Sequence, residues 1–160
     1  MKIKFYAVGG TIDKVYFDRI SDYQVGESML VDILSQANVT LDYECDSLIH
    51  KDSLDMTDAD RQMLFETIES DRHRRIVVTH GTDTMVETGK KLQGIENKTV
   101  VLTGAMQPAK FKSSDAEFNI GCAVGAVQTL PPGVYIAMNG RIFDPKRVRK
   151  NRELNRFEDA

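Results

Sequence analysis

Cysteine is scarce in this 160-residue chain, and Cys45 and Cys122 are the only two. Both lie inside predicted structural elements, and neither has a CxxC partner or a metal-ligand neighbourhood, so a disulfide framework and a cysteine metal site are excluded. We therefore expect a reducing, cytoplasmic location. No apolar run approaches the length of a membrane span, and the first one ends at Gly9-Gly10, too early for a signal peptide. We expect no membrane association and no export.

An excess of charge of one sign is also missing. The chain has 21 basic and 24 acidic side chains, a formal net charge of −3, and the two signs are interspersed over most of its length. No overall field therefore favours a nucleic acid or an acidic membrane surface as partner. The local exception is a basic tail from Arg141 to Arg156, which we interpret as a solvated or interface-forming surface rather than a nucleic-acid site.

Apolar, β-branched runs alternate with helix-period patterns along the chain. The length is sufficient for one domain with a substantial core. Strict alternation predicts right-handed crossovers, and hence a three-layer α/β fold of the Rossmann or flavodoxin-like kind, with a mostly parallel open sheet and helices on both faces. The predicted strands are 3–8, 39–49, 76–79, 99–103 and 134–138, and the predicted helices lie near 29–37, 57–68, 85–92 and 120–127.

Two segments lie outside this alternation. Residues 14–25 form a polar and aromatic stretch that is longer than a typical connection, and we expect a binding loop or lid there. Asp144-Pro145 has the pattern of a helix cap and first helical position.

The chemistry of the chain is concentrated at two predicted strand ends. Thr11 follows Gly9-Gly10, and the segment His80–Thr84 follows the run at 75–79. Ligands of open α/β sheets bind at the carboxyl ends of strands, and a threonine there becomes a nucleophile when a base and an oxyanion-stabilising group accompany it. The alternatives are that Thr11 is an ordinary turn residue, and that Thr82 or Asp83 only caps a helix beginning at Met85.

Three histidines are candidate bases because imidazole titrates near neutrality. His73 lies among charged residues, which predicts exposure, and His80 could serve only to support its turn, while His50 has no recognisable partner pattern. A lysine from the basic tail could act instead if its pKa were lowered by burial or nearby positive charge.

Three motifs, at Gly9–Ile12, His80–Thr84 and Thr103–Pro108, occur in one order along the chain. On these motifs the chain resembles the bacterial-type L-asparaginases, which include the glutaminase-asparaginases. The likeness runs from Ile3 to about Phe157 and covers the N-terminal α/β domain of that family only. We therefore expect residues 1–160 to form a single domain of this type, with the family's C-terminal domain absent.

The resemblance implies roles for five catalytic positions. Thr11 corresponds to the nucleophile, and Tyr23 to the tyrosine of a mobile loop that hydrogen-bonds it. Thr82 corresponds to the second catalytic threonine, Lys150 to the lysine bonded to that threonine, and Asp83 to the aspartate that anchors the α-ammonium group and orients the lysine.

The resemblance also implies how a substrate is held. Ser53 corresponds to the serine that holds the α-carboxylate, although Leu54 replaces the glutamine usual after it. Ala105 corresponds to the residue whose backbone faces the side-chain amide. No metal or organic cofactor is implied.

The function implied is hydrolysis of the side-chain amide of L-asparagine, or of a related small amide, through a threonine nucleophile and an acyl-enzyme. The alternative is a non-catalytic module that binds an amino acid or docks onto a partner. The family completes its site with the C-terminal domain of a neighbouring subunit. Without that domain, the apolar face on which it packs is left open, and we expect self-association as a homo-oligomer (dimer or tetramer) to cover this face. No nucleic-acid partner is expected.

Overall fold

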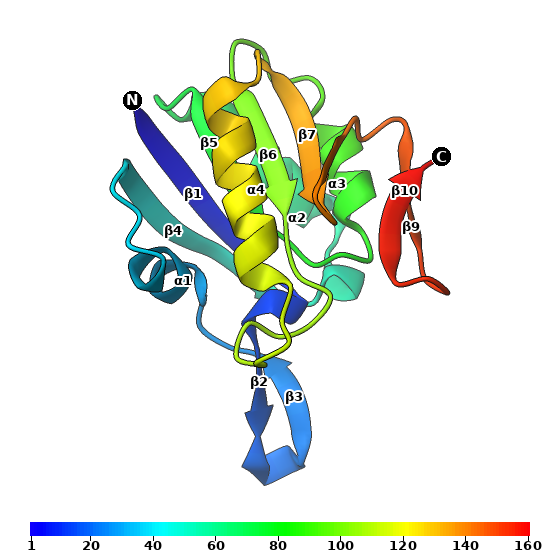
Figure 1. Cartoon of the computed structure of the whole chain (residues 1–160). Coiled ribbons are helices and arrows are strands. Elements are labelled where there is room, and N and C mark those ends of the chain that lie inside the picture. The colour runs from blue at the N-terminus through cyan, green and yellow to red at the C-terminus, as the bar shows by residue number, and fades with distance from the viewer.

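A computed structural model describes all residues, 1–160, and its centre is a six-stranded sheet (Figure 1). The strand order is β4-β1-β5-β6-β7-β8, with the first five strands parallel and β8 antiparallel to β7. The bounds are β1 Lys2–Gly9, β4 Asp42–Lys51, β5 Arg75–Thr79, β6 Thr99–Thr103, β7 Gly133–Met138 and β8 Arg141–Phe143. The direction of the strand order reverses at β1, so the adjacent carboxyl ends of β1 and β5 form a topological switch point, where such folds bind ligands.

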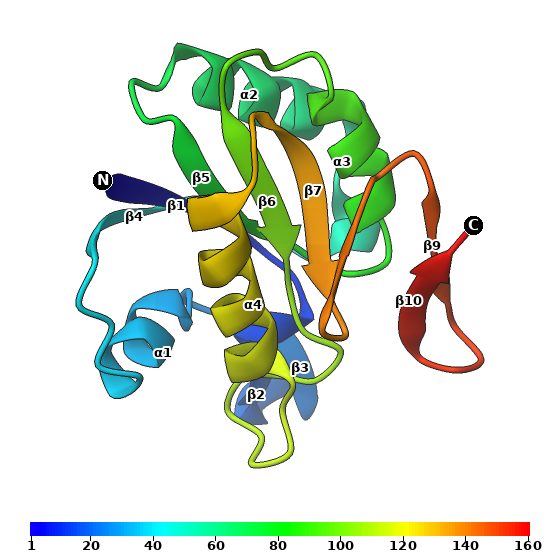
Figure 2. The same ribbon diagram turned by 45° about the horizontal axis from the view of Figure 1, so that its top comes forward.

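Helices cover both faces of the sheet, as predicted. Helices α1 (Leu30–Gln36) and α4 (Ala116–Thr129) pack on one face, and α2 (Asp58–Ser70) and α3 (Met85–Leu92) pack on the other. Figures 1 and 2 show α4 on the near side of the sheet and α2 and α3 behind it. Alternating side chains of the buried strands supply the two cores, which confirms the three-layer α/β prediction.

The five predicted parallel strands are all present, with β4 beginning at Asp42 rather than at residue 39. The predicted helix near 57–68 is confirmed as α2, and Thr57 caps it: the Thr57 hydroxyl accepts from the Asp60 amide at 3.2 Å, and the Thr57 amide donates to the Asp60 carboxylate at 2.8 Å. Helix α3 begins at Met85 as predicted, but Thr84 is its N-cap residue.

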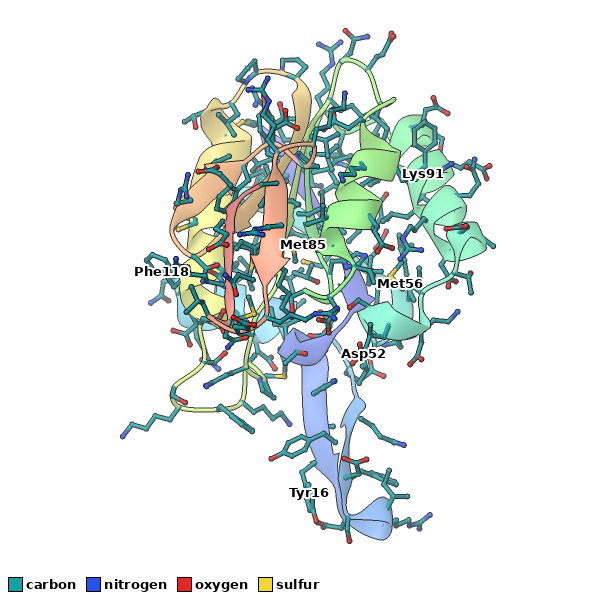
Figure 3. All side chains as sticks on the ribbon, turned by 90° about the vertical axis from the view of Figure 1, so that its right-hand side faces the viewer. Tyr16, Asp52, Met56, Met85, Lys91 and Phe118 are labelled. Carbon is teal, nitrogen blue, oxygen red and sulfur yellow. The ribbon has the colours of Figure 1, made fainter.

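Residues 14–25 form a hairpin rather than an irregular loop. Strands β2 (Lys14–Phe17) and β3 (Asp22–Val25) pair antiparallel around the short helix η2 (Asp18–Ile20), and Ser21 takes a left-handed conformation (φ 50°) at the turn. The hairpin extends beyond the carboxyl edge of the sheet, with Asp52 near its base and Tyr16 farther along it (Figure 3). Aromatic and β-branched residues favour strand pairing here despite the exposure.

The prediction of a helix at Asp144-Pro145 is wrong. The Asp144 side chain accepts from the Lys146 amide at 2.8 Å and its carbonyl accepts from the Arg147 amide at 2.9 Å, which closes a turn instead. A second hairpin follows, β9 (Val148–Asn151) with β10 (Arg156–Asp159), and it lies beside α3 (Figure 1). Val148 and Phe157 are buried in the core on the α2–α3 side, and this burial fixes the hairpin to the body.

Cys45 lies in β4 and Cys122 in α4, both as free thiols inside structural elements, as expected. None of the helices has the length and apolar character needed to cross a bilayer.

Candidate active site

Close backbone contact joins the two strand ends at the switch point. Gly10 has φ 96°, and a Cβ built on it would overlap Cα and N of Gly81. Only glycine permits both this conformation and this approach. Thr11, the first residue of the short helix η1 (Thr11–Asp13), and Thr82 each directly follow one of the two touching glycines. The two threonines singled out by the sequence therefore flank a single contact.

The segment after β4 closes a third side of this region. A Cβ on Gly81 would lie 2.5 Å from Cβ and 2.7 Å from Oγ of Ser53, which begins the short helix η3 (Ser53–Asp55). The Thr84 hydroxyl donates to the Ser53 carbonyl at 2.8 Å and ties the two segments together. Ser53 is buried, and its hydroxyl has no hydrogen-bond partner. A buried hydroxyl without a partner is costly and is commonly explained by a ligand or a water.

Lys150 connects the β9–β10 hairpin to this region. Its Nζ donates to Thr82 Oγ1 at 2.7 Å and to Asp83 Oδ1 at 2.9 Å, and only 14% of its side chain is exposed. The same Asp83 oxygen lies 3.4 Å from Nη2 of Arg152. The tail thus brings a lysine 67 residues distant in sequence onto the threonine-aspartate pair.

His80 is completely buried and is held by a chain of hydrogen bonds. Its Nδ1 lies 2.7 Å from the Gly81 carbonyl, and its Nε2 lies 2.8 Å from Oγ1 of Thr88. Arg61 Nε donates to the same Thr88 oxygen at 3.1 Å. Because a carbonyl can only accept, we assign the proton to Nδ1, so that Nε2 accepts from Thr88. Burial, with a smaller contribution from the Arg61 charge, lowers the pKa of His80 to about 4.

His80 is therefore a neutral residue that fixes the Gly81 carbonyl, in line with the expectation that it supports the turn. Its partners Arg61 and Thr88 were not predicted from the sequence. A signal was present, because Arg61 shares a helical face with Leu64 and Ile68, and Thr88 shares one with Met85 and Leu92, so both polar side chains fall on buried stripes.

The other two histidines make no hydrogen bond to either threonine. His73 precedes β5 at the opposite end of the sheet, and its Nδ1 is 2.6 Å from Asp71. Only 9% of its side chain is exposed, so the expectation of exposure is wrong, because Asp71 and Glu44 enclose it. His50 contacts Ser47 and the Gly26 carbonyl.

Tyr23 makes no hydrogen bond with Thr11. Its ring, 43% exposed on β3, makes edge contacts with Tyr16 and with Phe111, at centroid distances of 5.5 and 5.8 Å, and its hydroxyl makes no hydrogen bond. The Thr11 hydroxyl also makes none. Ala105 is buried just beyond β6, after Gly104, which packs tightly against the His80 carbonyl, whereas Leu54 is 66% exposed.

Asp13, two residues after Thr11, is a buried carboxyl group. Its side chain accepts from the Met29 amide at 2.9 Å. Burial raises its pKa to about 6, against the opposing effects of the Met29 hydrogen bond and of His50. This carboxyl ties the start of the β2–β3 hairpin to the segment before α1.

Known proteins with similar sequences and structures are asparaginases. The family model "Asparaginase, N-terminal" matches residues 2–158. L-asparaginase 2 of Escherichia coli (strain K12) is 31% identical over 159 residues, which cover 92% of this chain and 46% of that protein. The thermostable L-asparaginase from Thermococcus kodakarensis superposes with a TM-score of 0.86 at 29% identity, over 99% of this chain and 51% of the other.

The probable cytoplasmic L-asparaginase from Campylobacter jejuni superposes with a TM-score of 0.83, also at 29% identity, over 99% of this chain and 51% of the other. The chain thus spans about half the length of the relatives that it matches. From the family match over nearly its whole length, together with the shared fold, we conclude that this chain belongs to the asparaginase family and corresponds to its N-terminal domain.

Proposed function

We propose that the chain hydrolyses the carboxamide of L-asparagine or of a related small amide, with Thr11 as nucleophile. The observation that carries the proposal is the contact of Lys150 with Thr82 at 2.7 Å and with Asp83 at 2.9 Å. These groups lie beside Thr11 at the switch point of the sheet, where α/β folds bind their ligands. The named relatives that the chain resembles are L-asparaginases, which supports the same class of reaction.

In the first step the Thr11 oxygen attacks the carboxamide carbon, its proton passes to the amide nitrogen, and the carbon–nitrogen bond breaks. Ammonia leaves, and the acyl group remains as an ester on Thr11. Thr82 relays this proton: its oxygen, which accepts from Lys150, takes up the Thr11 proton as its own hydroxyl proton passes to the leaving nitrogen. In the second step water attacks the ester carbon, the ester bond breaks, and the proton of the water returns to the Thr11 oxygen.

Three groups have free capacity to hold the substrate. The buried Ser53 hydroxyl, which has no partner in the protein, donates to a substrate carboxylate. Lys150 and Arg152 both contact Oδ1 of Asp83, so Oδ2 is free to accept from the α-ammonium group of the substrate. The backbone at Ala105 faces the amide. Tyr23 acts on Thr11 only after the hairpin moves, because its ring now contacts Tyr16 and Phe111.

We also propose a homo-oligomer, a dimer or a tetramer, as the working form. Large apolar side chains on the β2–β3 hairpin and on α4 are exposed, and a second copy would cover them. The exposed position of Tyr23 favours one second candidate function, a non-catalytic module that binds an amino acid or docks onto a partner without turnover.

Ammonia release tests the main proposal and separates it from the second. The substrates are L-asparagine, D-asparagine, L-glutamine and small β-amides. We expect Thr11→Ala to lower the rate on the order of 10³-fold or more, and Thr82→Val to lower it on the order of 10²-fold. Thr129→Val, which changes an exposed threonine of α4, is the matched control and should leave the rate unchanged. Ligand binding by a folded protein that releases no ammonia would favour the binding module.

A further inference from the structure

Arg61 of α2 is a charged side chain that is almost completely buried. Helices α2 and α3 pack side by side on one face of the sheet (Figure 2), and Arg61 Nε donates across them to Thr88 Oγ1 at 3.1 Å. The outer nitrogens of Arg61, whose side chain is 8% exposed, lie 3.3 to 3.4 Å from the Met56 carbonyl and from the carboxylates of Asp58 and Glu87. Both carboxylates are mostly exposed, so these ion pairs contribute little. The bond to Thr88 is therefore the contact that directs the guanidinium inward.

This bond sets the direction of a hydrogen-bond chain that reaches the active-site turn. A guanidinium only donates, so the Thr88 oxygen accepts from Arg61 and becomes a better donor of its own proton, toward His80 Nε2 at 2.8 Å. The proton of the neutral imidazole is then on Nδ1, which donates to the Gly81 carbonyl at 2.7 Å. A carbonyl only accepts, so both ends of the chain favour the same direction.

Without Arg61 the chain can reverse at Thr88. The Thr88 hydroxyl can then donate to the carbonyl one turn earlier in α3, as helical threonines do, and accept from a proton on His80 Nε2. That tautomer leaves Nδ1 without a proton, so two acceptors face each other across the 2.7 Å between Nδ1 and the Gly81 oxygen. The carbonyl has to turn away. Since the Gly81 carbonyl and the Thr82 amide belong to one planar peptide unit, Thr82 moves with it.

The turn that would move is tightly held on its other sides. Gly81 packs against the backbone of Gly10, and the Thr82 hydroxyl accepts from Lys150 at 2.7 Å. A rotation of the peptide unit disturbs both contacts. Because a reaction rate is sensitive to displacements of about 1 Å in a reacting group, such a rotation slows catalysis without removing any catalytic side chain.

We infer that Arg61 is a positioning residue for the proposed hydrolysis, because it fixes the tautomer of His80 and thereby the orientation of Thr82. The inference rests on the proposed function, in which Thr82 relays a proton. Two side chains separate Arg61 from the active-site turn, so Arg61 does not touch the reacting atoms. Its effect is therefore expected on kcat rather than on KM.

Three substitutions separate the donor function of Arg61 from its bulk and charge. Arg61→Met removes donor and charge but keeps a long side chain. Arg61→Gln places an amide that can donate or accept, and Arg61→Lys keeps a charged group that only donates. Arg72→Met is the matched control, because Arg72 lies just beyond α2, is 80% exposed and pairs with Glu44 at 3.5 Å.

Ammonia release is measured at a temperature at which every variant is folded. The kcat of Arg61→Met should fall on the order of tenfold, with KM changed by less than about twofold. Arg61→Gln should lie between this variant and the wild type. Arg61→Lys should stay within about threefold of the wild type, and the control should be unchanged.

The 15N NMR signals of the His80 ring give a readout that a general loss of stability does not move. Protonated and unprotonated ring nitrogens have well-separated 15N shifts, and the chain has only three histidines to assign. At pH 7 the wild type and Arg61→Lys should carry the proton on Nδ1. Arg61→Met and Arg61→Gln should show a population with the proton on Nε2.

An unchanged kcat in both the methionine and glutamine variants, a His80 ring that keeps its Nδ1 proton in both, or an equal loss of rate in Arg61→Lys would each overturn the inference. If Arg61→Met does not fold, Arg61→Gln decides by the same criteria. If the wild type releases no ammonia from any amide, the proposed function fails, while the 15N spectra still decide whether Arg61 fixes the His80 tautomer.

Discussion

Replacing Thr88 by valine removes the hydroxyl that links Arg61 to His80 while nearly preserving side-chain volume. Thr88 is completely buried, and its oxygen lies 3.1 Å from Arg61 Nε and 2.8 Å from His80 Nε2. The valine would leave one buried donor and one buried acceptor without partners. At about 1–2 kcal/mol for each unsatisfied group, the free energy of unfolding should fall by about 3 kcal/mol.

This magnitude is large enough for equilibrium unfolding to resolve it. With a urea dependence of about 2 kcal/mol per molar, the unfolding midpoint should fall by roughly 1.5 M, and the melting temperature by about 9 °C. Thr129→Val on the exposed end of α4 is the control, because its hydroxyl bonds only carbonyls of its own helix, at 3.0 and 3.4 Å. That variant should lose less than about 0.5 kcal/mol.

Thr88→Ser separates hydrogen bonding from packing. Serine keeps the hydroxyl but loses a methyl group, which costs about 1 kcal/mol of burial. If the hydrogen bonds matter most, serine should be the milder substitution, and if packing matters most, valine should be. A valine variant as stable as the wild type, or more stable than the serine variant, would refute the idea that Thr88 holds His80 and Arg61 through its hydroxyl.

Three further perturbations probe the same region. Asp13→Asn should raise the free energy of unfolding by about 2 kcal/mol above pH 6 and change it little near pH 4. Burial raises the pKa of the Asp13 carboxyl to about 6, so in the wild type its stabilising contribution is lost as the pH rises from about 4 to 6. Urea unfolding at several pH values measures this difference. Because the pKa of His80 is lowered to about 4, the neutral imidazole contributes fully to the free energy of unfolding above pH 6.5. This contribution, about 3 kcal/mol, should be lost as the pH falls from 6.5 to 4. The Asp13→Asn protein reveals the loss best, because the opposing titration of Asp13 is absent there. Gly10→Ala should destabilise the protein by about 2 kcal/mol or more, because the new Cβ would overlap Gly81 and an alanine would be strained at the positive φ of Gly10. A thermal melt with an unchanged midpoint would contradict the close contact of the two glycines.

Local patterns in the sequence identified the fold class and the ends of the two strands that carry Thr11 and Thr82. This was possible because burial on a sheet or helix imposes a period of 2 or 3.6 residues, which is written directly into a sequence. The cap at Thr57 can also be recognised from the sequence, because its two residues, Thr57 and Asp60, are only three apart. The resemblance to asparaginases rested on the same short motifs.

Other contacts were decided only by the tertiary structure. Both hairpins escaped prediction, because short exposed strands have little buried periodicity, and Asp144-Pro145 opened a turn where its local pattern indicated a helix. The contact of Arg152 with Asp83 joins residues far apart in the chain, and the exposed position of Tyr23 depends on where the β2–β3 hairpin extends.

The sequence by itself therefore determined which residues lie at the carboxyl edge of the sheet. Their partners were decided by packing between elements, as when α2 and α3 bring Arg61 and Thr88 onto His80. The physical reason is that a residue's own neighbours set its local conformation, whereas a long-range hydrogen bond or ion pair depends on how whole elements are placed against one another.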